Sequence, residues 1–241
     1  MKKYPLFFTH IPKTAGTSFL WGVLYENYNN SEILEPKGIR ELMKLYNDEV
    51  RIIREHLPFG MHLFIRKKPK YYTILRNPVE RGISHYYFVK NSENHHYKSI
   101  HERYTLKQFF NKSKIQRYRF ISHSHLIDNM QTRFIAGLGN NFYGRNSKIM
   151  LDKAKKNLEK YFPIIGIKER FNDSVKLFIN YYNLHDFREI YKKTTQNKPV
   201  LESLDDDTRE ILFENHKLDI QLYEFAIERF NALISNSKKR V

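Results

Sequence analysis

The chain has 241 residues, enough for one sizeable hydrophobic core, and no cysteine, which excludes disulfides, zinc–thiolate sites and cysteine nucleophiles. Its formal net charge of +16 favours anionic partners such as nucleic acid, acidic polysaccharide, anionic lipid or a phosphorylated cofactor. An aromatic content of 15% argues for a well-packed interior and against disorder.

Lysine and arginine are spread along the chain and cluster only at the end, in Lys238, Lys239 and Arg240. Dispersed charge is weaker evidence for nucleic-acid binding than a clustered basic stripe. No apolar run approaches the ~18 residues that cross a membrane, and the apolar stretch after the basic start is too short for a signal peptide. We therefore expect a cytoplasmic protein with at most a peripheral membrane contact.

The first half of the chain predicts three strands, each short, apolar and followed by a polar turn, over residues 4–9, 50–55 and 71–75. Helices are expected over residues 17–28 and 39–46. Pro78 marks the start of a further helix, since the first helical turn does not need the N–H that proline lacks.

The second half predicts a polar insertion and a helical end. The insertion covers residues 91–119, with one short helix at 106–110. Further helices are expected over residues 128–135, 147–160, 174–182 and 207–233, and further strands over 162–168 and 187–192. Asp207, with Glu210 three positions later, is the predicted start of the last helical region, in one or two pieces. Residues 1–234 then form a single domain, and the basic tail 235–241 is expected to be disordered.

Strands that alternate with helices predict an α/β fold, with a mainly parallel sheet, helices on both faces and a helical C-terminus. Ligands of such sheets bind at the carboxyl ends of the strands. Lys13, His56 and Arg76 each follow a predicted strand. One site can therefore use all three.

The segment 12–18 reads P-K-T-A-G-T-S and leads from a strand into a helix. A helix N-terminus offers unpaired N–H groups and a positive dipole end, to which Lys13 and the hydroxyls add donors, while Gly16 admits a close ligand. The segment makes the sheet P-loop-like, but it is shorter than G-x-x-x-x-G-K-[ST] and its lysine precedes the glycine. It predicts an anion site and puts magnesium-dependent triphosphate chemistry in doubt. The alternative is an ordinary turn with a solvated lysine.

A second segment, L-R-N-P-V-E-R-G-I-S-H-Y-Y-F, covers residues 75–88. Arg76 stands at a strand end, and Ser84 follows eight positions later, about two helical turns on. An arginine fork and a hydroxyl can grip a second phosphate. In isolation the same pattern also suits an arginine that pairs with a carboxylate. The pattern becomes a specific indication of a phosphate site only in combination with the Lys13 segment.

Together, H-I-P-K-T-A-G-T-S-F and the second segment resemble the two cofactor motifs of sulfotransferases, closest to the family of heparan sulfate 2-O-sulfotransferase and bacterial relatives. The family's donor is 3′-phosphoadenosine 5′-phosphosulfate (PAPS), which leaves the product PAP. The resemblance implies that Arg76 and Ser84 hold the 3′-phosphate. It implies that the 5′-phosphosulfate is held by Lys13, Thr14, Ala15, Gly16, Thr17 and Ser18. Stretches at 56–62, 128–133 and 218–226 are also similar, whereas Glu55 stands where relatives often have glycine.

The resemblance implies in-line sulfuryl transfer to an acceptor hydroxyl, in which positioning and charge stabilisation dominate. Lys13 would neutralise charge on the leaving phosphate, and His56, at the place of the family's catalytic histidine, would take the acceptor's proton. A structural role for His56 is the alternative, with His62 as the second candidate base. Weaker candidates for cofactor or acceptor contacts are Asn129, Gln131 and Arg133, which equally suit helix packing.

The histidine pairs His95–His96 and His123/His125 do not predict a metal, since no carboxylate stands at helical spacing beside them. The expected acceptor is a carbohydrate, either an acidic glycan or a lipid-linked sugar, although a small molecule also fits. Two other interpretations stay open: a P-loop-type kinase, and a non-catalytic basic protein that binds nucleotide or nucleic acid. Magnesium-dependent ATP consumption would identify the first, and steeply salt-dependent binding to DNA or RNA the second.

Overall fold

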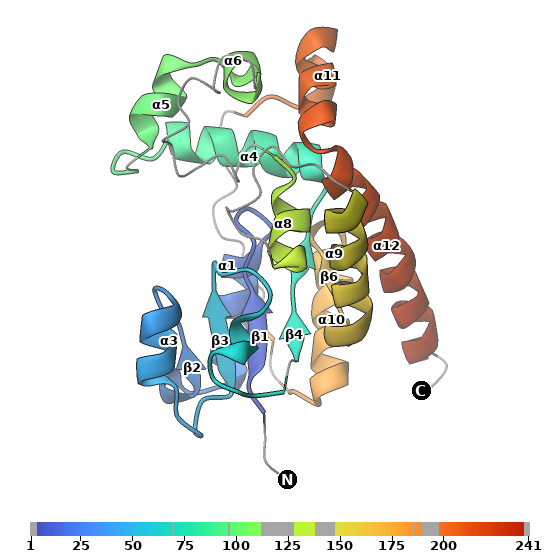
Figure 1. Cartoon of the computed structure of the whole chain (residues 1–241). Coiled ribbons are helices and arrows are strands. Elements are labelled where there is room, and N and C mark those ends of the chain that lie inside the picture. Colours follow the sequence, from blue (N-terminus) through green and yellow to red (C-terminus); the bar gives the residue numbers. More distant parts are fainter. Residues whose placement is uncertain are drawn as a thin grey trace.

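The computed structural model has an α/β architecture built around short parallel strands (Figure 1). It describes residues 4–68, 70–95, 97–111, 128–137, 148–185, 187–188 and 198–238. One sheet in this part of the chain has the order β2-β3-β1-β4, with the strands Ile33–Leu34, Ile52–Glu55, Leu6–Thr9 and Tyr71–Tyr72. A second sheet pairs β5, Ile74–Leu75, with β6, Gly166–Ile167. Every described pairing is parallel, so the predicted α/β class is confirmed.

The strand predicted over residues 71–75 forms, but it changes partner at Thr73. Its first part pairs with β1 and its second part with β6. The Thr73 hydroxyl donates to the Thr9 carbonyl at 2.9 Å, and the Gly166 N–H donates to the Thr73 carbonyl at 2.9 Å. Thr73 therefore links the two sheets just before the chain reaches Arg76.

The other strand predictions are confirmed in part. The strands expected at 4–9 and 50–55 are β1 and β3, whereas β2 was not predicted. Within the predicted strand 162–168, only Gly166–Ile167 pairs with another strand. Phe162, Ile164 and Ile165 are buried in the core but do not join a sheet, and their burial explains the apolar pattern that suggested a longer strand. The prediction of a strand at 187–192 is wrong for Phe187 and Arg188, and its remainder lies outside the described residues.

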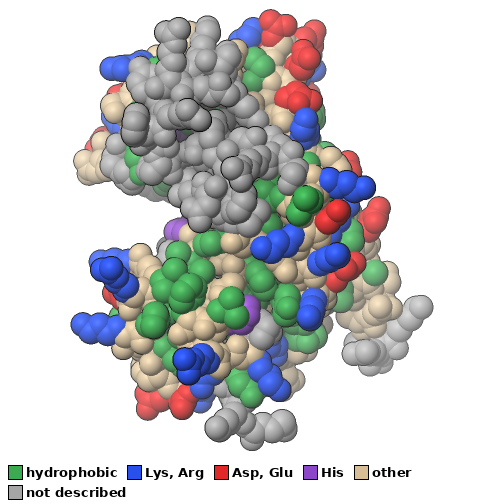
Figure 2. Space-filling view, in the orientation of Figure 1, with side chains coloured by type: hydrophobic (Ala, Val, Ile, Leu, Met, Phe, Trp, Pro, Cys, Tyr) green, Lys and Arg blue, Asp and Glu red, His purple; other side chains and the backbone are tan. Residues whose placement is uncertain are grey.

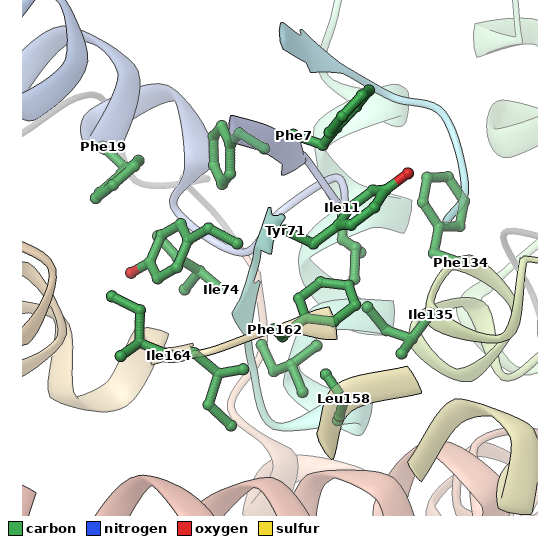
Figure 3. Close-up of a cluster of buried hydrophobic side chains, with 14 of the residues drawn as sticks. Phe7, Ile11, Phe19, Tyr71, Ile74, Phe134, Ile135, Leu158, Phe162 and Ile164 are labelled. Carbon is green, nitrogen blue, oxygen red and sulfur yellow. The ribbon is translucent and has the colours of Figure 1, made fainter. Parts of the chain in front are cut away.

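The sheet is buried on both faces, and alternate residues of its strands point to opposite sides (Figure 3). Phe7 stacks on Tyr71, with ring centroids 4.8 Å apart, on one face. Phe8 and Tyr72 contact Phe19 on the other face. Parallel strands that are covered on both sides read as continuous apolar runs, which is why L-F-F-T and Y-Y-T-I-L were recognisable.

Helices cover both faces. A continuous helical segment follows β1 and consists of α1, Gly16–Phe19, a π-helical turn, Leu20–Leu24, and α2, Tyr25–Asn27. This segment and α10, Phe171–Tyr182, cover the same face of the sheet, where Phe19 contacts Phe178. The opposite face is covered by α8, Met130–Ala136, and α9, Lys148–Tyr161. The helix α3, Ile39–Leu45, lies beside β2, and α12, Lys217–Lys238, packs on α8, α9 and α10 (Figure 1). No helix in these ranges is both long and apolar enough to cross a membrane.

A second, smaller core lies beyond the carboxyl ends of the strands. There α4, Pro78–Lys90, crosses above the sheet and packs against α5, Lys98–Arg103, and α11, Asp206–Asn215 (Figure 1). The helix α6, Leu106–Phe110, packs against α11 and closes this core. The predicted short helix at 106–110 is confirmed, α5 was not predicted, and residues 112–119 of the proposed insertion lie outside the described residues.

Two predicted limits in the C-terminal region are wrong. The helix α11 starts after the cap Asp205, whose Oδ1 accepts from the Thr208 N–H at 2.9 Å, so Asp207 is not the cap. The helix α12 continues through Lys238, so residues 235–238 of the predicted tail 235–241 are helical and not disordered, and residues 239–241 lie outside the described residues. Of the two alternatives left open, one piece or two, the structure has two, with the break at His216.

Candidate active site

The three predicted strand ends converge on the loop between β1 and α1. Arg76, after β5, donates from Nη1 to the Lys13 carbonyl at 3.1 Å. His56, after β3, places Nδ1 2.7 Å from the His10 carbonyl. Because both side chains hold this loop by its backbone, the loop, the arginine and the histidine form one structural unit.

The loop carries an unusual backbone. Lys13 has φ of 70° and Ala15 has φ of 69°, in the left-handed region that non-glycine residues avoid at a cost of roughly 1–2 kcal/mol each. Ala15 is followed directly by the helical Gly16 at the start of α1. A left-handed residue next to a right-handed one turns successive N–H groups toward one side, which forms a concavity suited to an anion. The geometry of this turn therefore fits the predicted anion site.

The three hydroxyls of the loop are not equivalent. Thr14 is buried, and its hydroxyl donates to the Ile11 carbonyl at 2.8 Å. Thr17 is exposed and Ser18 is half-buried on the first turn of α1. In this arrangement the Thr14 proton stabilises the turn, so its hydroxyl as a donor to a ligand stays a prediction. Thr17 and Ser18 are better placed for that purpose.

Gly16 makes room for a histidine of the chain. A Cβ at this position would lie 2.1 Å from Cδ2 and 2.3 Å from Nε2 of His10, far inside any real contact. The sequence predicted that the glycine leaves space for a ligand's approach. The structure gives a different reason, which is the packing of the His10 ring against the start of α1.

Two cations sit at the loop in partly buried positions. Lys13 Nζ lies 4.1 Å from the centroid of the Phe88 ring, and burial, followed by repulsion from Arg76 and Lys198, lowers the pKa of Lys13 to about 8. Arg76 is 7% exposed, and its Nε is buried without a hydrogen-bond partner in the described part of the chain. A buried guanidinium N–H without an acceptor fits a site that an anion completes.

Lys198 joins this cluster, although no motif in the sequence pointed to it. Its Nζ lies 2.7 Å from Oε2 of Glu80, the same oxygen that Arg76 Nη2 contacts at 3.3 Å. Burial, then Arg76, lowers the pKa of Lys168 nearby, with a contribution from Lys198. Several cations therefore share few carboxylates here, an excess of positive charge that suits phosphate groups. Ser84 is buried on α4 in the same region of the fold.

Asn129, Gln131 and Arg133, for which ligand contact and helix packing were both left open, are packed in the core. All three are at most 1% exposed. Gln131 clamps the Arg76 backbone, with Oε1 accepting from its N–H at 3.0 Å and Nε2 donating to its carbonyl at 2.8 Å. Asn129 Oδ1 accepts the N–H of Asp219 at 3.0 Å, and Arg133 pairs with Asp128 at 2.7 Å. These side chains position Arg76 and α12 from within the core.

His62 is a structural histidine in this arrangement, so its candidacy as the base is not supported. It is buried against the sheet face, and its Nδ1 lies 2.9 Å from the Tyr71 hydroxyl. That hydroxyl accepts the N–H groups of Gly60 and His62, both at 3.2 Å, so its own proton points to Nδ1. The imidazole therefore has a complete local role.

His56 has the geometry of a proton acceptor. A carbonyl oxygen can only accept, so Nδ1 carries the proton and Nε2 carries the lone pair of the neutral ring. The side chain reaches solvent, yet the protein packed around it lowers the pKa of His56, and Arg54 adds to this effect. The hydrogen bond to His10 and the charge of Glu35 act in the opposite direction. His56 is therefore neutral at pH 7.

The remaining histidine pairs give no metal-ligand set within the described ranges, where no three His, Asp or Glu side chains come together. His96, His123 and His125 lie outside those ranges, as does the side chain of Glu55.

Comparisons with known proteins agree on one family. The profile of the sulfotransferase family matches residues 1–226. Heparan sulfate 2-O-sulfotransferase 1 of Mus musculus is 23% identical over 257 residues, covering 93% of this chain and 70% of that protein. Heparin sulfate O-sulfotransferase of Drosophila melanogaster is 23% identical over 251 residues, covering 92% and 71%. The Xenopus laevis heparan sulfate 2-O-sulfotransferase 1 is 24% identical over 257 residues, covering 93% and 70%.

Proposed function

Because this chain belongs to the sulfotransferase family, we propose that it transfers the sulfuryl group of PAPS to a hydroxyl of a carbohydrate acceptor. The observation that carries the proposal is the convergence of the Lys13 loop, Arg76 and His56 at one end of the sheet. The similar proteins are named for O-sulfation of heparan sulfate or heparin, which supports a sugar hydroxyl as the acceptor. An acidic glycan or a lipid-linked sugar, and a cytoplasmic location, stay predictions.

Two anion sites would hold PAPS in a P-loop-like manner. The 5′-phosphosulfate fits the start of α1, with Lys13, the backbone of Ala15 and Gly16, and the hydroxyls of Thr17 and Ser18. The 3′-phosphate fits Arg76, Ser84 and Lys198, where it would replace Glu80 as the partner of the two cations. The cofactor supplies the activated sulfuryl group, and these residues supply charge and orientation.

The chain's own residues divide the work of an in-line displacement. His56 Nε2 takes the proton of the acceptor hydroxyl as that oxygen attacks. Lys13 faces the phosphate that leaves and stabilises its growing negative charge. The clamp of Gln131 on Arg76 keeps the second anion site in register with the first. Positioning and electrostatics then account for the rate, as they do in phosphoryl transfer.

The competing interpretations have weaker support. In a Walker loop the hydroxyl after the lysine binds magnesium, whereas the Thr14 hydroxyl is buried and bonded to Ile11, which disfavours a kinase. On the described part of the face that Figure 2 shows, Lys and Arg side chains are interspersed with hydrophobic and acidic ones, unlike the clustered basic stripe typical of nucleic-acid binding.

An acceptor screen with labelled PAPS tests the proposal. Label should move to a glycan, and turnover should persist in EDTA. Transfer from ATP in the presence of magnesium, with no transfer from PAPS, would contradict it.

Replacing Arg76 by alanine should weaken PAP binding by about 10- to 150-fold, since one charge-assisted contact contributes on the order of 1.5–3 kcal/mol. AMP lacks the 3′-phosphate, so its affinity should fall less than that of PAP, by no more than the lost Arg76 contact with the Lys13 carbonyl costs the loop. Calorimetry with both nucleotides measures the difference. The exposed Arg209, paired with Asp206 on α11, provides the matched control Arg209→Ala. If AMP binds the unaltered protein as tightly as PAP, the 3′-phosphate site is misplaced.

A further inference from the structure

A chain of hydrogen bonds runs beneath His56 and starts at the ring of His10. Arg54, on β3, donates from Nε to His10 Nδ1 at 3.0 Å, and its Nη2 also contacts this nitrogen. A guanidinium can only donate, so Nδ1 of His10 accepts and its proton sits on Nε2. His10 is 4% exposed, and burial, then the neighbours His56 and Arg54, hold its pKa well below the usual value. His10 is therefore held in one neutral tautomer.

Arg54 is fixed from its other side. Its Nη1 pairs with Oε2 of Glu35, the residue that follows β2. Tyr25, on α2, donates its hydroxyl to Oε1 of Glu35 at 2.7 Å. The guanidinium thus lies between a carboxylate and an imidazole, with little freedom to change its direction.

The ring of His10 supports His56 directly. The centroids of the two imidazoles are 4.3 Å apart, and the carbonyl of His10 holds Nδ1 of His56 at 2.7 Å. The His10 ring also stacks on Phe8, with an interplanar angle of 7°, and its edge fills the space at Gly16. A rotation of His10 would therefore displace both His56 and the start of α1.

We propose that Arg54 is a positioning residue of the transfer reaction: it locks His10 in one tautomer, and through His10 it sets the orientation of His56, with Glu35 and Tyr25 holding Arg54 in place. This inference rests on the proposed function, in which His56 is the base. Neither of the two cofactor motifs contains Arg54, Glu35 or Tyr25, because the three stand on different elements and meet only in the fold.

Opposite charges act on His56 from two elements. Arg54 of β3 lowers the pKa of His56, whereas Glu35, after β2, raises it. His10, after β1, is neutral and contributes its carbonyl. A base works only when deprotonated, so the acid limb of the profile of kcat/KM against pH follows the pKa of His56. Removing the positive charge should move this limb to higher pH, and removing the negative charge should move it to lower pH.

The experiment compares Arg54→Met, Arg54→Lys and Glu35→Gln with the unaltered full chain. At the optimal pH, Arg54→Met should lower kcat by about 10- to 100-fold, the scale of a misplaced reacting group, with a smaller loss of PAP affinity, because the His10 ring also borders the start of α1. Arg54→Lys, which keeps one donor and the charge, should recover part of the loss. Arg51→Met is the matched control, because Arg51 lies just before the same strand and contacts Glu32 at 3.9 Å on the surface. It should behave as the unaltered protein.

A second measurement needs no activity. Nitrogen-15 spectra of histidine-labelled protein report which ring nitrogen is protonated, and His10 should be protonated at Nε2 alone, becoming a tautomer mixture in Arg54→Met. If the tautomer and the pH profile are the same in Arg54→Met as in the unaltered protein, the proposal is wrong, even if the variant is less stable. If His56→Ala is active while the tautomer changes as expected, the proposed base fails and the lock on His10 stands.

Discussion

Replacing His56 by alanine is expected to lower turnover by roughly 10²–10⁴-fold, the usual contribution of positioned proton transfer. PAP affinity should change much less than turnover, because His56 holds the donor loop through the His10 carbonyl, whereas Lys13, Arg76 and the start of α1 meet the phosphates. Turnover under saturating PAPS, with calorimetry for PAP, separates the two effects. A loss of PAP affinity equal to the loss of turnover would mean that the imidazole supports the donor loop and is not the base.

His62→Ala is the matched histidine control. The change removes the partner of the Tyr71 hydroxyl inside the core, so the free energy of unfolding should fall by about 1–3 kcal/mol. Below the melting temperature, activity should be retained. An inactive His62→Ala together with an active His56→Ala would reverse the roles assigned to the two residues.

The parts of the site that the sequence could predict are those that local patterns carry. A short apolar run followed by a polar turn marks a strand end in any parallel sheet, so the sequence alone places Lys13, His56 and Arg76 at one edge of the sheet. The residues that hold them could not be predicted in this way. Arg54 and His10 are 44 positions apart, and Lys198 and Glu80 are 118 apart, so no local period links them.

Polar residues in the core were the main source of error. Asn129, Gln131 and Arg133 read as a polar helix face that could meet a ligand, yet each is buried with its hydrogen bonds directed to other elements. Composition cannot distinguish a solvated amide from one that clamps a distant backbone. Thr14 and Gly16 illustrate the same difficulty. The Thr14 hydroxyl, expected to bind a ligand, donates to the Ile11 carbonyl, and the space at Gly16, expected to admit a ligand, is filled by the His10 ring.

Lys13→Ala is expected to weaken PAP binding and to lower turnover by roughly 10²–10³-fold, because the ammonium meets both the bound phosphate and the charge that grows on it. Lys90→Ala is the control: Lys90 lies on the same side of the fold, with Nζ 5.7 Å from the centroid of the Tyr86 ring. It should leave both quantities unchanged. If Lys13→Ala and Lys90→Ala have the same PAP affinity and the same turnover, Lys13 does not contact the donor.

The pH dependence of PAP binding gives a sharper test of Lys13. Burial lowers the pKa of this lysine to about 8, so the side chain is charged at pH 7 and loses its proton as the pH rises through 8. Phosphate groups, whose second pKa is about 6, are fully ionised over that range and do not contribute to the change. PAP affinity should therefore fall between pH 7 and about 9.5, where the lysine is neutral. Arginine stays protonated there, so in Lys13→Arg the fall in PAP affinity over this range should be much smaller. If the unaltered protein shows no fall, the lysine is not the cation that the phosphate meets.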